Sequence, residues 1–269
     1  MKRIVLWTAA LLLIAGSWGG NVWYYNSMQL SEPMFLPHYI AADVRSGSID
    51  LMYLENRSDA GEVTAIRIDE LPGLRFEHYE YTRYSHQVAM KAMANWNPDT
   101  LGVDAAQLPI TVTEATIYYR NKEPRKVPIG EIRIFEGENS GVFEGVSAGG
   151  SSDGTGSYSV RLKEPITLEK VDYTFSERLA DAFRLELNDR PASESYPIEL
   201  AAGDTLAFDY EWLGRGDRQA DFEGYQIKLL LYMRTADGRS VVETLPISYN
   251  VYLSEKQVKR LVRAGGELP

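Results

Sequence analysis

The stretch from Leu206 to Trp212, LAFDYEW, shows most clearly how the chain folds. Large apolar residues occupy every second position, and Asp209 and Glu211 fall between them. Successive side chains of a β-strand point to opposite faces, so this pattern predicts a strand with one buried and one solvated face. The same alternation recurs at residues 66–69, 131–134, 158–163, 183–187 and 247–253.

Turn residues separate these stretches. Asp237 and Gly238 form a strong hairpin signal between two apolar runs. Proline is tolerated at the first position of a strand, and five prolines stand directly before isoleucine: Pro109, Pro128, Pro165, Pro197 and Pro246. Many short strands at this spacing predict an all-β fold with two antiparallel, Ig-like β-sandwich domains.

The clearest change in composition runs from Gly145 to Ser157, GVSAGGSSDGTGS. Glycine and serine at this density are typical of a flexible loop or linker. We therefore place a domain boundary near residue 160. The first sandwich domain is expected at residues 29–160 and the second at 161–253.

The N-terminal segment has the character of an export signal that is retained as an anchor. Lys2 and Arg3 precede an uncharged segment from Ile4 to Tyr25, and the next charged residue is Glu32. As a helix this segment spans about 33 Å, enough for a bilayer core of about 30 Å. Residues 1–28 are thus predicted to form a signal anchor, with the N-terminus cytoplasmic and the remainder extracellular at the cell membrane. The alternative is cleavage near Ser17 and secretion.

The C-terminal segment, residues 254–269, is predicted to form a short amphipathic helix and tail. Ser254 and Gln257 have the spacing of a capping box, and Val258, Leu261 and Val262 share one helical face. The opposite face is basic. Its candidate interaction residues, which would contact an anionic membrane surface or an acidic partner, are Lys256, Lys259, Arg260 and Arg263. The alternative is that the apolar face packs on the last domain and these basic residues are solvated.

Composition limits the possible functions. The chain has no cysteine, which excludes disulfides, thiol nucleophiles and cysteine-ligated metals, and suits an exported bacterial protein. Its formal net charge is −10, which disfavours nucleic acid as a partner. No motif identifies a catalytic residue, a metal ligand or a cofactor site. Trp96, which precedes Asn97-Pro98 in an expected loop, is the candidate aromatic platform for a ligand.

These features together predict a membrane-anchored, extracytoplasmic protein with a non-catalytic binding, scaffolding or sensing role at the cell surface. Its partner would be a membrane protein or a component of the cell envelope. Two alternatives stay open. One is an envelope hydrolase that acts on glycan or peptide with carboxylate catalysts, and the other is an accessory subunit of a membrane complex.

Overall fold

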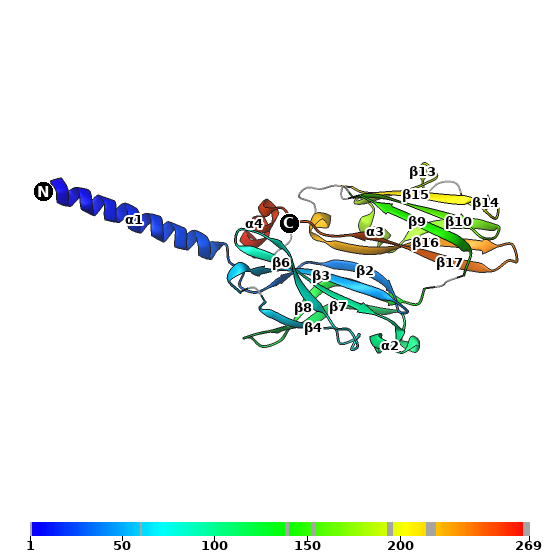
Figure 1. The fold of residues 1–269 in the computed structure, drawn as a ribbon, viewed down its shortest axis with the longest axis horizontal. Coiled ribbons are helices and arrows are strands. Elements are labelled where there is room, and N and C mark those ends of the chain that lie inside the picture. Colours follow the sequence, from blue (N-terminus) through cyan, green and yellow to red (C-terminus); the bar gives the residue numbers. More distant parts are fainter. Residues whose placement is uncertain are drawn as a thin grey trace.

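A computed structural model describes residues 2–59, 61–137, 140–151, 154–192, 196–213 and 219–265. The chain is mostly β, as predicted, with a long helix at its N-terminus and a short one near its C-terminus (Figure 1). The N-terminal half contains α1 (Lys2–Ser27), β1 (Met34–Phe35), β2 (His38–Asp43), β3 (Gly47–Asn56), β4 (Val63–Arg67), β5 (Glu77–Arg83), β6 (Gln87–Trp96), α2 (Pro98–Leu101), β7 (Ile110–Tyr119) and β8 (Arg125–Phe135).

The C-terminal half continues with strands and two further helices. It contains β9 (Phe143–Gly150), β10 (Thr155–Leu162), β11 (Ile166–Tyr173), α3 (Ser176–Leu179), β12 (Phe183–Leu187), β13 (Arg190–Pro191), β14 (Ile198–Leu200), β15 (Thr205–Trp212), β16 (Gly224–Thr235), β17 (Ser240–Tyr249) and α4 (Glu255–Arg263). A 3₁₀ turn, η3 (Gln219–Phe222), precedes β16.

One sheet is common to both halves of the molecule. Its strands follow the order β14-β11-β16-β2-β8-β7-β4, and β17 pairs with β16. The sheet β1-β3-β6-β5 packs against its N-terminal part, and the sheet β13-β12-β15-β10-β9 against its C-terminal part (Figure 1). The two sandwiches are therefore joined through a continuous layer.

Strand β2 makes that junction and departs from the predicted antiparallel pairing. It pairs in parallel with β8 on one side and with β16 on the other. Two glycines permit the close approach: a Cβ at Gly130 would lie 2.2 Å from the His38 carbonyl oxygen, and one at Gly224 would lie 2.5 Å from His38 Cδ2. The other strand pairings in the described part of the chain are antiparallel.

The predicted boundary at residue 160 lies inside β10 rather than between domains. Strands β9 and β10 form a hairpin that pairs with β15, so much of the expected linker is regular sheet. The chain passes from the first sandwich to the second between β8 and β9. The pairing of β9 with β10 and of β10 with β15 supplies the regular structure that the glycine and serine content of these strands does not favour.

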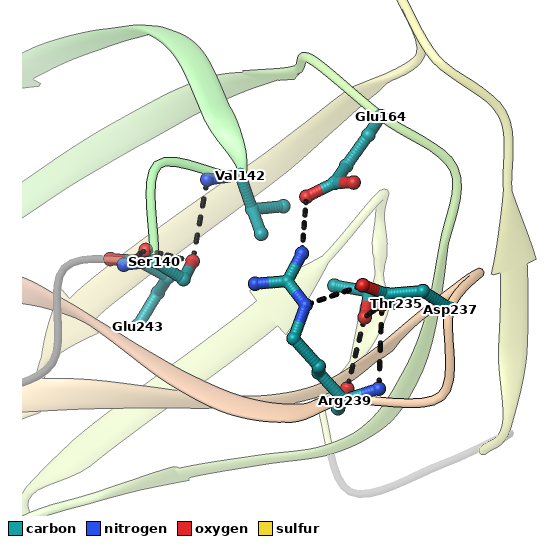
Figure 2. Close-up of polar contacts among 7 residues, drawn as sticks. All are labelled: Ser140, Val142, Glu164, Thr235, Asp237, Arg239 and Glu243. Atoms are coloured by element: carbon teal, nitrogen blue, oxygen red, sulfur yellow. Dashed lines mark hydrogen bonds and ion pairs between the residues drawn. The ribbon is translucent and has the colours of Figure 1, made fainter.

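Glu243 fastens this passage to β17 (Figure 2). The Ser140 backbone N–H donates to Glu243 Oε1 at 2.7 Å, and the Ser140 hydroxyl donates to the same oxygen. The Val142 N–H in turn donates to Ser140 Oγ at 3.3 Å. A buried carboxylate on β17 thus fixes the point at which the chain enters the second sandwich.

The β16–β17 turn has the predicted hairpin chemistry. Gly238 adopts a positive φ of 86°, and Arg239 Nε donates to Asp237 Oδ2 at 2.7 Å. Hydrogen bonds from the Thr235 hydroxyl and from Arg239 lower the pKa of Asp237 to about 2. Arg239 also forms an ion pair with Glu164 at 3.6 Å, which connects the turn to the start of β11 (Figure 2).

Helix α1 projects away from the sandwiches (Figure 1). Nowhere in the described part of the chain does a helix combine the length and the apolar character needed to cross a membrane, so the structure does not support the predicted transmembrane span. Gly16, Ser17, Gly19 and Gly20 lower the hydropathy of the second half of the helix.

Helix α4 forms as predicted. The Ser254 side chain accepts from the Gln257 N–H, and the Gln257 side chain accepts from the Ser254 N–H. Val258, Leu261 and Val262 are buried against β3, β6 and the segment before the helix. The predicted tail beyond residue 265 lies outside the described residues.

A candidate binding cleft beside the C-terminal helix

A cleft of about 910 Å³ lies where the ends of β15 and β17 meet the first turn of α4. We call it the aromatic cleft because five aromatic side chains line it. Its lining residues are Tyr81, Gly150, Ser151, Gly154, Thr155, Tyr210, Trp212, Asp221, Ser248, Tyr249, Asn250, Tyr252, Ser254, Lys256 and Gln257.

Tyr210 and Trp212 reach the cleft because they end the alternating strand β15. Leu206 and Phe208, on the same face, are fully buried between the sheets. Trp212 is 8% exposed and packs against Phe183 and Tyr249, with ring centroids 4.8 and 5.0 Å away. The apolar face of β15 thus runs out of the core and becomes the wall of the cleft.

The indole nitrogen of Trp212 is the exceptional polar group of this wall. It is buried, and its N–H has no hydrogen-bond acceptor among the described residues. A buried donor left without a partner costs about 1–3 kcal/mol. Because the nitrogen has no accessible surface in this arrangement, an acceptor on a bound molecule would recover that cost only if the wall moved to expose it.

Glycine in the β9–β10 hairpin makes room for the Tyr210 ring. A Cβ at Gly156 would lie 2.2 Å from Tyr210 Oη, while one at Gly150 would lie 3.7 Å from the same atom. The ring therefore lies over the backbone of β10, where an alanine would displace it. The glycine-rich composition that we interpreted as a linker shapes this part of the cleft.

A buried charge lies behind the side of the cleft nearest the N-terminal half. Lys91 on β6 is buried; its Nζ donates to Asn250 Oδ1 at 3.0 Å and lies 4.9 Å from the centroid of the Tyr81 ring. Its nearest carboxylate oxygen is Asp50 Oδ2 at 3.8 Å. Lys91 thus orients two lining residues, Asn250 and Tyr81. It was missed in the sequence because a single lysine in an apolar stretch gives no spacing pattern.

Helix α4 contributes one of its predicted interaction residues to the cleft. Lys256 lines it beside Ser254 and Gln257. Lys259 forms an ion pair with Glu255 at 3.3 Å. Arg260 and Arg263 are exposed on the same face of the helix, beyond the cleft.

The prediction that Trp96 forms an aromatic platform is wrong. Trp96 ends β6 and is 6% exposed. Its Nε1–H donates to the carbonyl oxygens of Asp43 and Val44, both at 3.2 Å, and its ring covers Gly47. The Asn97-Pro98 signal marks the start of α2 rather than an exposed loop around the tryptophan.

A second groove, of about 620 Å³, lies on the outer face of the β15 sheet. Arg184 stands opposite Glu211 and forms an ion pair with it at 3.0 Å, while Glu186 stands opposite Asp209. A catalytic carboxylic acid needs a shielded environment to stay protonated. Asp209 is exposed and Glu211 is paired, so this groove has the character of a solvated charged surface.

No family model and no curated protein matches this chain. Among solved structures, the chain is similar to a protein of unknown function from Porphyromonas gingivalis W83. The two are 8% identical, the match covers 82% of this chain and 97% of that chain, and the TM-score is 0.26. A similarity at this level carries no functional argument.

Proposed function

We propose that the protein is a non-catalytic binding protein of the cell surface, which receives its ligand in the aromatic cleft. The observation that carries the proposal is the aromatic wall of the cleft, in which the buried N–H of Trp212 has no acceptor among the described residues. Binding sites characteristically combine apolar walls with a few polar groups that orient the ligand.

The lining chemistry favours a glycan of the cell envelope. Tyr210, Tyr249 and Tyr252 offer aromatic faces, and Ser248 and Asn250 offer short polar side chains. A sugar ring presents both C–H faces that pack on aromatic rings and hydroxyls that exchange hydrogen bonds. Tyr252 is 72% exposed, so a ring at the rim is accessible to a polymer.

The proposal includes attachment to a membrane through α1. Large apolar side chains along the helix are exposed, including Leu13 at 76% and Trp18 at 71%. The uncharged segment from Ile4 to Tyr25, preceded by Lys2 and Arg3, supports insertion with the body outside. Transfer of such side chains from water into lipid is favourable by about 25 cal/mol per Å² of apolar surface.

Binding of the full-length protein to isolated cell-wall sacculi tests the cleft. Trp212→Phe keeps the aromatic wall and removes the N–H, so we expect about three- to tenfold weaker binding, the value of one hydrogen bond. Tyr252→Ala removes an exposed ring and should also weaken binding. Trp96→Phe is the matched control, because Trp96 lies outside the cleft.

Equal binding by wild type, Trp212→Phe and Tyr252→Ala would contradict the cleft proposal. Thermal unfolding of each variant shows whether a loss of binding reflects a loss of fold.

Attachment is tested separately with the full-length gene in a Gram-positive host. Membranes are washed with carbonate and the N-terminus of the retained protein is determined. An intact N-terminus in the washed membranes supports the anchor. A mature protein in the medium that begins near Trp18 contradicts it and indicates secretion.

A further inference from the structure

The exposed face of α4 is a basic stripe, made by Lys256, Lys259, Arg260 and Arg263. At 3.6 residues per turn these positions fall within one arc of the helix. The buried residues Val258, Leu261 and Val262 occupy the opposite face. Such a concentration of positive charge is notable in a chain whose net charge is −10.

Helix α4 lies at the end of the body from which α1 projects (Figure 1). The β5–β6 turn connects the two helices. Its Ser85 N–H donates to the Glu255 carboxylate, at 3.1 Å to Oε2, and the His86 ring meets the rings of Tyr24 and Tyr25 with centroids 5.7 and 5.8 Å away. A single turn therefore touches the last turns of α1 and the first turn of α4.

The end of α1 is fixed to the body rather than joined by a flexible linker. Met28 is 1% exposed, and its carbonyl oxygen accepts from Gln87 Nε2 at 2.5 Å. The Asn56 side chain donates to the Leu30 carbonyl and accepts from the Leu30 N–H, both at 2.8 Å. The direction of α1 in a membrane would thus determine how far α4 lies from the membrane surface.

We infer that the basic stripe of α4 rests on the anionic lipid headgroups of the membrane into which α1 inserts. The inference depends on the proposed attachment through α1. Tyr24 and Tyr25 are amphipathic aromatic residues of the kind that lie at a membrane–water interface. They place α4 at headgroup level, where each basic residue strengthens attraction to an anionic leaflet about fivefold. A lipid surface fits better than an acidic protein because the α1 contact positions the stripe.

The test uses the full-length chain, which has no cysteine, so that one introduced cysteine carries the only label. Ala264→Cys places a fluorophore at the exposed end of α4, and Ser240→Cys places the control at the β16–β17 hairpin, far from α1. Each labelled protein is reconstituted into vesicles of neutral phosphatidylcholine, with or without about one-third phosphatidylglycerol. A small share of the lipids carries a nitroxide quencher on the headgroup.

We expect the probe at residue 264 to be quenched strongly in anionic vesicles, and the probe at residue 240 to remain unquenched. The double variant Lys256→Glu with Arg263→Glu should abolish the difference in quenching between the two probes, and about 0.5 M salt should reduce that difference. Lys163→Glu with Arg161→Glu, an equal charge change on the second sandwich, should leave the quenching unchanged.

Flotation separates this inference from the attachment on which it rests. If the protein floats with neutral and anionic vesicles but both probes stay unquenched, the lipid contact is overturned and attachment stands. If it floats with anionic vesicles alone, in a manner that depends on Lys256 and Arg263, attachment through α1 fails and the lipid contact is supported. Flotation with neither vesicle overturns both.

Discussion

His38 is a buried histidine whose two ring nitrogens are both engaged. Nε2 accepts from the Met52 N–H at 3.0 Å, so Nδ1 carries the proton and donates to the Leu36 carbonyl at 2.7 Å. Burial lowers the pKa of His38 to about 4. The neutral imidazole therefore ties β2 to β3 at the position where the two sandwiches join.

Acidification is expected to weaken the protein through this residue. Between pH 6.5 and about 4 the unfolded chain binds a proton that folded His38 does not, so the free energy of unfolding falls as pH falls through that window. The full loss is about 3 kcal/mol. Chemical denaturation at pH 7 and pH 5 measures the part that has developed at pH 5.

His38→Asn is the control for this pH dependence. Burial also lowers the pKa of His78, so the wild-type slope contains a second contribution with the same sign. The pH dependence of the free energy of unfolding should be smaller in the variant by the contribution of His38, and the contribution of His78 should remain. An identical slope in the variant and the wild type would show that His38 is not the residue responsible.

The surroundings of single residues could be predicted from the sequence only in part. Alternation correctly predicted that Trp212 continues a buried face, but not that the face would emerge into a cleft. The surroundings of Trp96 were predicted from Asn97 and Pro98, which determine the next helix and carry no information on burial. Burial of one side chain depends on strands distant in sequence, here β3 and the segment after β2.

Among the elements, α4 shows a case in which the local sequence was sufficient. The capping box and the apolar face predict the helix, and both are present. We expect Ser254→Ala to reduce the free energy of unfolding by about 1 kcal/mol, because the cap satisfies an otherwise unpaired N–H. Urea denaturation of Ser254→Ala beside Ser240→Ala, an exposed strand position, measures the difference; equal losses would contradict a specific capping role.

Strand β2, strand β9 and the first residues of β10 were beyond local prediction for two different reasons. Alternation reports which face of a strand is buried but not the direction of its partners, so the parallel pairing of β2 left no signal. In β9 and the first residues of β10 the glycine and serine content disfavours a strand, and the pairing of β9 with β10 and of β10 with β15 overrides that preference. The domain boundary expected near residue 160 rested on the interpretation of residues 145–157 as a loop or linker.

At the scale of the whole molecule, an ionic cluster around a buried carboxylate secures the shared sheet. Glu223, 1% exposed, accepts from Arg178 Nε at 3.2 Å, and Arg178 Nη2 and the Tyr225 hydroxyl also donate to it. The Arg178 guanidinium lies 4.0 Å from the centroid of the Tyr39 ring on β2. The cluster thus links α3 and β16 to the strand at the junction.

Glu223→Gln is expected to reduce the free energy of unfolding by about 1–3 kcal/mol, since it weakens hydrogen bonds to a charged group in a buried position. Glu211→Gln is the matched control, because its ion pair with Arg184 is exposed and worth less than about 1 kcal/mol. Both are measured by denaturant titration. A loss in Glu223→Gln no larger than that in Glu211→Gln would mean that the cluster contributes little.

The parallel pairing of β2 also bears on the order in which the protein acquires its structure. The chain is made from its N-terminus, so β2 is complete long before β16, the partner that meets it at Gly224. Until then one edge of β2 exposes unpaired backbone groups, which other chains can join. The central layer closes only when nearly all of the polypeptide has been synthesised, and early exposure of this edge is the stage at which the protein most needs protection from aggregation.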